Sequence, residues 1–110
     1  PGAVHHRGYL NAEEHGHIAI AGPVTNLLLA AVFLPVYLGG TVVGVDLLAT
    51  LGRFGIVINL FLAAFNLVPY GPLDGKTVKR WSTPVWLGTF LGSVVLTVGA
   101  MVTVGLSFQL

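Results

Sequence analysis

Residues 66 to 75 read Asn-Leu-Val-Pro-Tyr-Gly-Pro-Leu-Asp-Gly, and they close a long apolar run. Pro69 and Pro72 each lack a backbone N–H, and a proline ring clashes with the carbonyl one turn earlier, so a helix that arrives at Asn66 should break here. The break is expected to present Asp74 from an irregular segment near the edge of a membrane. Non-helical backbone at that depth is tolerated only inside protein or beside a water-filled cavity. Carboxylates in such places are costly, and most are paired, metal-bound or functional.

The composition indicates a membrane protein. The chain has 110 residues, of which 55% are hydrophobic and 8% are charged. A soluble domain of this size could not hide so much apolar surface behind so few charges. The formal net charge of +1 predicts no nucleic-acid partner, and the absence of cysteine excludes disulfides and thiolate zinc sites. Residues 1–110 are therefore expected to form a single membrane-embedded domain.

Apolar runs predict three transmembrane helices, at about residues 12–38, 47–68 and 84–106. At 1.5 Å per residue, each is long enough to cross a hydrocarbon core of about 30 Å. Asn11 can cap the first helix, and Glu14 can answer the backbone N–H of Asn11 in a capping box. The predicted fold class is an all-α polytopic membrane bundle, whose second helix is broken at the segment from Asn66 to Gly75.

Two asparagines stand out in these apolar segments. Asn26 and Asn66 each carry an amide that needs a partner in apolar surroundings. One reading is a hydrogen bond between helices, worth about 0.6 kcal/mol on average in membranes. The other reading is support for a functional site. Pro23, close to Asn26, should kink the first helix or mark its true start.

A short basic stretch follows the break. Lys76, Lys79 and Arg80 lie within six residues of Asp74, and such an excess of positive charge favours the cytoplasmic side of a membrane. The Asp74 end is therefore predicted to face the cytoplasm, with residues 1–10 forming a polar loop on the same side. Two alternatives for the basic residues are a solvated loop and contacts with anionic lipid headgroups.

The broken segment also resembles a known motif. Asn66-x-x-Pro69-x-x-x-x-Asp74-Gly75 is similar to the motif of the site-2 protease family, the intramembrane zinc metalloproteases. The earlier stretch Ala21-Gly-Pro-Val-Thr-Asn26 is similar to the Gly-Pro-x-x-Asn segment of the same family, and the two segments occur in the family's order. The resemblance implies a zinc-dependent endopeptidase that hydrolyses peptide bonds in or near transmembrane segments of membrane proteins.

The resemblance implies zinc as the cofactor and Asp74 as its third ligand. The other two ligands and the catalytic Glu would come from a His-Glu-x-x-His motif on an earlier transmembrane helix. This chain lacks that motif, since none of its histidines has the required neighbours: His5, His6, His15 and His17. The chain is therefore expected to be the C-terminal half of such a protease, inactive alone and without a catalytic residue of its own.

The resemblance also implies supporting roles near Asp74. Asn66 and Asn26 would offer amide groups to a strand-like substrate or to the developing oxyanion. Pro69 would fix the position of the carboxylate, and Gly75 would let the chain turn after it. The implied substrate is a transmembrane protein in the lipid bilayer, and the expected location is the cell membrane.

A non-catalytic membrane protein is the alternative prediction. It could be a pseudoprotease that binds substrates, or a transporter fragment whose proline-broken helix lines a cation path. An upstream His-Glu-x-x-His motif would favour the protease, whereas a second broken helix in an upstream repeat would favour the transporter.

Overall fold

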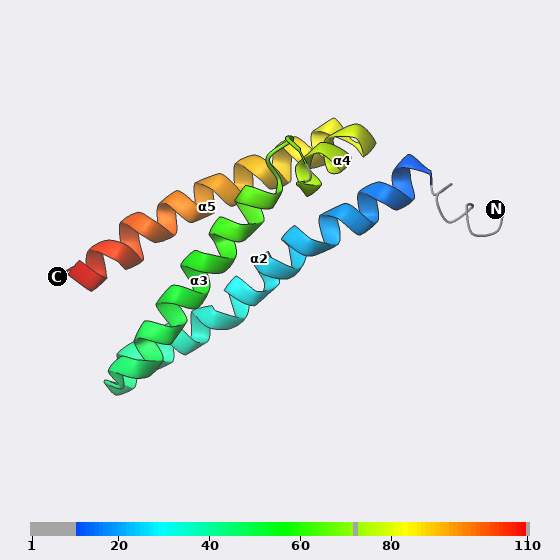
Figure 1. The fold of residues 1–110 in the computed structure, drawn as a ribbon. Coiled ribbons are helices and arrows are strands. Elements are labelled where there is room, and N and C mark those ends of the chain that lie inside the picture. The colour runs from blue at the N-terminus through cyan, green and yellow to red at the C-terminus, as the bar shows by residue number, and fades with distance from the viewer. Residues whose placement is uncertain (1–10, 72, 110) are drawn as a thin grey trace.

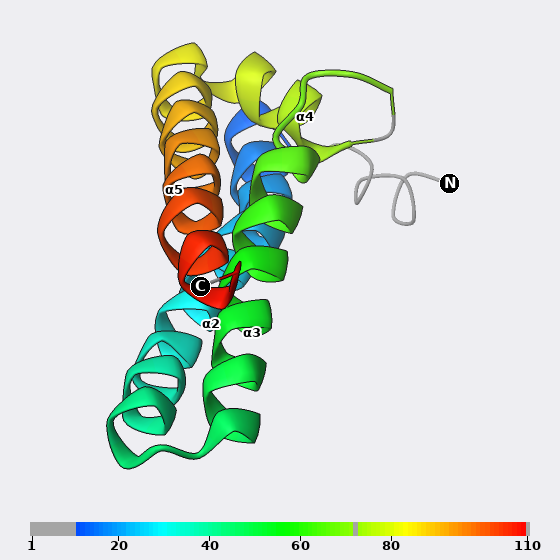
Figure 2. The same ribbon diagram turned by 90° about the vertical axis from the view of Figure 1, so that its left-hand side faces the viewer.

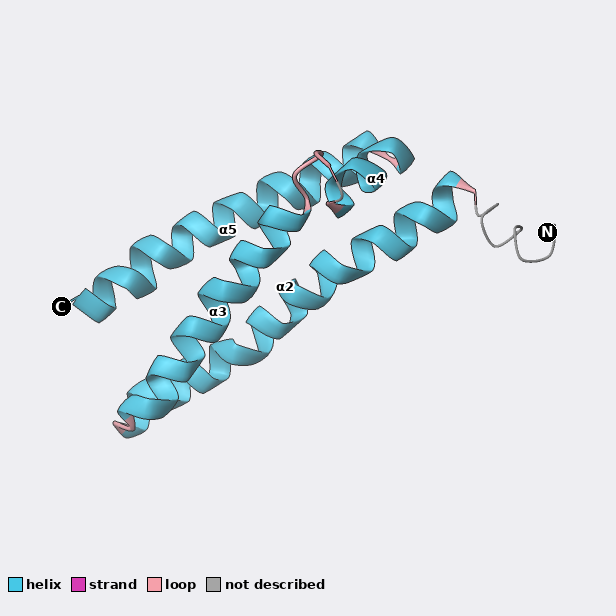
Figure 3. Ribbon diagram, in the orientation of Figure 1, coloured by secondary structure: helices cyan, strands magenta, loops and turns pink. Residues whose placement is uncertain are grey.

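The structure, a computed structural model, describes residues 11–71 and 73–109 as four helices joined by short turns. In chain order, the helices are α2 (Ala12–Val43), α3 (Asp46–Asn66), α4 (Asp74–Trp81) and α5 (Thr83–Gln109). No strand occurs in this part of the chain (Figure 3). The predicted all-α class is confirmed, whereas the loop expected at residues 1–10 lies outside the described residues.

α2 and α3 form a long antiparallel hairpin (Figure 1). The turn depends on Gly44, whose φ of 75° lies in the left-handed region that favours glycine. The N–H of Val45 then donates to the carbonyl of Gly40 at 2.9 Å, which satisfies one of the last carbonyls of α2. Because Gly44 supplies this stop signal, α2 continues past residue 38 to Val43.

The first helix is continuous through its prolines. Pro23 and Pro35 both lie inside α2, so Pro23 does not mark its start. The capping box predicted at Asn11 is confirmed: the N–H of Glu14 donates to Asn11 Oδ1 at 2.8 Å, and the N–H of Asn11 donates to Glu14 Oε1 at 3.0 Å. Prolines inside membrane helices are tolerated where neighbouring groups and local adjustments satisfy the freed carbonyls.

α5 packs along α3, and the short α4 crosses the end of the bundle between α2 and α5 (Figures 1 and 2). Two buried clusters hold these elements together. One lies beside α4 and comprises Ala19, Leu67 and Val78, and the other lies between α2 and α3 and comprises Ala30, Ile56 and Leu60. The cluster beside α4 determines how the broken segment sits on the bundle.

Among the described residues, three helices are long and apolar enough to cross a membrane: Glu13–Val43, Asp46–Asn66 and Thr83–Thr103. Large apolar side chains along them face outward, among them Leu28 at 62% and Val95 at 67% exposure. Exposure of this much apolar surface to water would be unfavourable, and soluble proteins rarely expose large continuous apolar patches. The exposed surface therefore fits a membrane protein.

The contact between α2 and α3 generates a stability prediction. A Cβ atom at Gly52 would overlap the backbone of Tyr37, so Gly52→Ala should force the two helices apart. Overpacking of this kind costs about 1–3 kcal/mol in unfolding free energy. The unfolding free energy is measured in detergent micelles by circular dichroism.

Gly99→Ala is the matched control for this substitution. Gly99 lies within α5, and a Cβ there would meet no atom within 4 Å. This change should leave stability unchanged or raise it by up to about 1 kcal/mol through helix propensity. Equal destabilisation by both changes would contradict the packing argument.

Candidate functional site

The predicted break begins where α3 ends, at Asn66. The residue before a proline is biased away from the α conformation, so Val68 cannot continue the helix into Pro69. The N–H of Val68 donates instead to the carbonyl of Phe65 at 3.2 Å, which closes a final tight turn. Gly71 then takes a left-handed φ of 57°, and the chain reverses before α4 begins. α3 is therefore shorter at this end than the 47–68 range expected from its apolar run.

A single backbone carbonyl anchors the segment after the break. Leu67 is fully buried, and its carbonyl accepts a hydrogen bond from Trp86 Nε1 at 2.7 Å. A Cβ atom at Gly75 would overlap the same carbonyl, so only glycine lets α4 approach this closely. The carbonyl of Leu67 therefore joins the ends of α3, α4 and α5.

Asp74 is the first residue of α4 and is half-buried. A Cβ atom at Gly22 would lie 3.3 Å from its Oδ2, so the carboxylate rests against α2. No hydrogen bond reaches this carboxylate from residues 11–71 or 73–109. Burial raises the pKa of Asp74 above its ordinary value of 3.8, because the charged form loses solvation.

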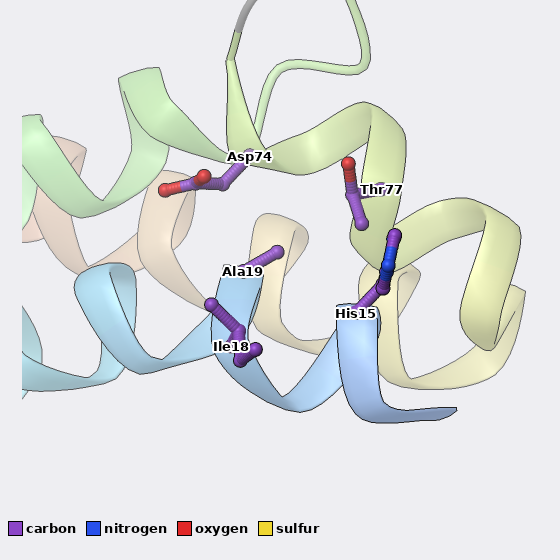
Figure 4. A pocket seen from close by; sticks show the side chains of 5 residues that line it. All are labelled: His15, Ile18, Ala19, Asp74 and Thr77. Atoms are coloured by element: carbon purple, nitrogen blue, oxygen red, sulfur yellow. The ribbon is translucent and has the colours of Figure 1, made fainter. Parts of the chain in front are cut away.

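A hollow of about 320 Å³ separates α4 from α2 beside this carboxylate. Asp74 and Thr77 project into it from α4, and α2 contributes His15, Ile18 and Ala19 (Figure 4). The carboxylate points away from the His15 ring (Figure 4). The described part of the chain contains no group of three or more His, Cys, Asp or Glu side chains that could hold a metal ion. These residues therefore offer a metal one carboxylate.

The structure brings the two sequence motifs together through Asp74 and Gly22. Asn26 lies one turn beyond Gly22 on the same face of α2, and both Asn26 and Asn66 are half-buried. Within the described ranges, neither amide side chain makes a hydrogen bond. Pro69 is half-buried in the connecting segment. The roles of these two asparagines and of Pro69 stay predictions.

The apolar runs of the sequence do not predict α4, which follows the break directly. The segment is only eight residues long, too short for helical periodicity to stand out. A weaker signal was available: Asp74 in the first turn and Lys79 and Arg80 in the last turn suit the helix dipole. That charge order could have predicted a helix in place of a loop.

Two tryptophans fix α4 between its neighbours. The Trp81 side chain lies directly on Gly16, where a Cβ would overlap the ring, and the ring of His17 meets Trp81 edge-on at 4.8 Å. On the other side, Lys79 Nζ lies 5.0 Å from the centre of the Trp86 ring. The glycine and the carbonyl that these two tryptophans contact are distant from them in sequence, so no local pattern predicts either contact.

A second hollow of about 280 Å³ lies between the helices and is lined by apolar side chains: Leu27, Ala30, Ala31, Leu34, Ile56, Leu60 and Leu96. It offers no acid, base or metal ligand. The chemistry available to the described residues is therefore concentrated around Asp74.

The described residues thus form a membrane-type helical bundle that presents one carboxylate just after a broken helix. No family model and no solved structure matches the chain. Two curated proteins do match. A Methanocaldococcus jannaschii protein named "Putative zinc metalloprotease" is 47% identical over 90 residues, which are 78% of this chain and 44% of that protein.

A Synechocystis protein with the same descriptive name is 43% identical over 69 residues, which are 57% of this chain and 16% of that protein. The chain spans less than half the length of these two relatives. The identities support a relation to the zinc metalloproteases for which these relatives are named.

The hydrogen bond from Trp86 leads to a second prediction. Trp86→Phe keeps an aromatic ring that can stack on Phe90, now 5.5 Å away between centroids, but it leaves the buried Leu67 carbonyl without its donor. The unfolding free energy should fall by about 1–3 kcal/mol. Trp81→Phe removes an indole N–H that makes no hydrogen bond within the described residues, so it should cost less. A larger loss from Trp81→Phe would contradict this assignment.

The raised pKa of Asp74 leads to a third prediction. A carboxyl whose pKa is higher in the folded than in the unfolded state destabilises the fold as pH rises through and above the unfolded value. Asp74→Asn should therefore raise the thermal midpoint at neutral pH in the presence of a chelator, and the gain should vanish below the ordinary pKa of 3.8.

Asp46→Asn serves as the control for this titration. Asp46 is exposed in the first turn of α3, where a negative charge is favourable, so its loss should lower the midpoint slightly at neutral pH. A gain of stability in Asp46→Asn as large as that in Asp74→Asn would show that net charge, not desolvation of Asp74, causes the effect.

Proposed function

We propose that this chain is the part of an intramembrane zinc endopeptidase of the site-2 protease class that carries the carboxylate ligand of the metal. The observation that carries the proposal is the contact between Asp74 and the Gly22 turn of α2, because it joins the two motifs that resemble that family. The similarity to relatives named as zinc metalloproteases supports the same activity.

Asp74 has the properties expected of one zinc ligand. Its carboxylate is half-buried, borders a hollow and accepts no hydrogen bond from the described residues, so its oxygens remain available to a cation. Catalytic zinc takes three protein ligands drawn from histidine and carboxylate. Since the described residues supply one, the proposal places the two histidines and the catalytic Glu in a segment outside them.

The bound metal would polarise the scissile carbonyl and lower the pKa of water. The residues of this chain would set the geometry. Gly75 allows α4 to sit on the Leu67 carbonyl, which directs Asp74 toward α2. Pro69 stiffens the segment before it. Asn26 and Asn66, whose amides are unpaired within the described residues, would hydrogen-bond an extended substrate or the developing oxyanion.

The proposed substrate is a transmembrane protein, cleaved in or near its membrane-spanning segment within the lipid bilayer. The proposed location is the cell membrane, with the Asp74 end toward the cytoplasm. Lys76, Lys79 and Arg80 support this orientation, because positive residues beside transmembrane helices are concentrated on the cytoplasmic side.

Asp74→Ala tests the function in a form of the protein that contains the histidine pair. Loss of the carboxylate should lower zinc affinity by more than about 100-fold, since loss of a residue that only supports a ligand already costs 10- to 100-fold. Cleavage of a transmembrane substrate should disappear with the zinc. Zinc content is measured by atomic emission and cleavage by gel mobility of the substrate.

Asp46→Ala is the control for this test, because Asp46 lies at the start of α3, at the opposite end of that helix from the break. It should retain both zinc and cleavage. Full zinc content and full activity in Asp74→Ala would remove the proposal.

A further inference from the structure

The short helix α4 carries three positively charged side chains. The side chains of Lys76, Lys79 and Arg80 are exposed, whereas Val78 on the opposite face is completely buried. No ion pair joins any of the three to a carboxylate within residues 11–71 and 73–109. The positive charge of α4 is therefore available to an external anion.

Arg80 borders a small hollow between α2 and α4. The hollow has a volume of about 130 Å³ and is lined by His15, Thr77, Arg80 and Trp81. A guanidinium presents a fork of N–H donors that matches phosphate oxygens, and the Thr77 hydroxyl and His15 imidazole can add further donors. This set of groups suits a phosphate more than a carboxamide or an apolar group.

Two carboxylates, Glu13 and Glu14, precede His15 in the first turn of α2, but neither of them lines the hollow. Glu14 accepts the N–H of Asn11 at 3.0 Å in the capping box, and this bond holds its carboxylate at the helix start. The hollow lining itself contains no acidic side chain. Because no acidic side chain lines the hollow and no ion pair within the described residues engages Arg80, its charge is available to a ligand.

The place of α4 along the bundle indicates where such a ligand would come from. α4 connects the ends of α3 and α5, which are both long and apolar enough to cross a membrane. Trp81 and Trp86 lie at this same level, and tryptophans are enriched at the headgroup level of membranes. A short amphipathic helix with basic residues at this depth meets lipid headgroups.

We propose that the hollow formed by His15, Thr77, Arg80 and Trp81 binds the phosphate of an anionic phospholipid headgroup. The guanidinium of Arg80 bonds the phosphate oxygens, and the exposed Lys76 adds attraction from one turn away on the same face of α4. This hollow shares His15 and Thr77 with the hollow beside Asp74, so the headgroup would lie next to the candidate site.

Tryptophan fluorescence provides the test, because the chain has only two tryptophans: Trp81 ends α4, and the ring of Trp86 lies beside Lys79 of α4. The chain is reconstituted in phosphatidylcholine bilayers that contain increasing proportions of brominated phosphatidylglycerol. Quenching by this lipid, compared with quenching by brominated phosphatidylcholine, measures their relative affinities. The unaltered chain should prefer phosphatidylglycerol.

Arg80→Gln should reduce this preference about fivefold, the factor that corresponds to about 1 kcal/mol for one basic side chain near an anionic surface. Arg80→Lys should keep part of it, because it keeps the charge and loses the fork. Lys79→Gln removes the same charge from a side chain that lies over the Trp86 ring and outside the hollow, so it should retain most of the preference. Circular dichroism verifies that each variant is folded.

Three outcomes would overturn the proposal. Equal losses in Arg80→Gln and Lys79→Gln, or no preference in the unaltered chain, would show that no local headgroup site exists. Removal of the preference by inorganic phosphate, beyond the effect of sodium chloride at equal ionic strength, would assign the hollow to soluble phosphate. The test requires no proteolysis, so its outcome is independent of the proposed zinc endopeptidase activity.

Discussion

The hydrogen bond from the Trp86 indole to the Leu67 carbonyl, 2.7 Å long, holds the broken segment on the bundle. Where α3 ends, this carbonyl leaves the helical ladder while its residue is completely buried. A buried carbonyl without a donor costs free energy comparable to a lost hydrogen bond. Trp86 supplies the donor from α5, and Gly75 lets α4 pack against the same group. The position of three helix ends therefore depends on one backbone oxygen.

The direction of α4 follows from this anchor. Val78 packs in the core beside Leu67. The Trp81 ring packs directly on Gly16 of α2, where any residue larger than glycine would overlap the ring. With both contacts made, the first residue of α4 reaches α2 at Gly22, and Asp74 borders the hollow there. The place of the carboxylate is thus a consequence of packing among all four helices, not of the loop that precedes it.

A lone half-buried carboxylate is unfavourable by itself, as the raised pKa of Asp74 shows. The fold tolerates this cost where Asp74 borders a hollow between α2 and α4. A cation at that point would favour the ionised form and offset the desolvation. The raised pKa of Asp74 is therefore consistent with its proposed role as a metal ligand. In the proposed enzyme, the remaining ligands come from groups outside the described residues.

The sequence by itself determined the helical class, the three membrane-length helices, the capping box at Asn11 and the break before Asp74. These features depend on the length of apolar runs, on capping residues and on prolines, all of which act locally along the chain. It also marked the two motifs, but not their contact. Only the tertiary structure decided that Asp74 meets Gly22 and that α5 supplies the donor for Leu67. Trp86 and Leu67 are 19 residues apart. No local periodicity records such a pairing, since it arises only when separate helices pack.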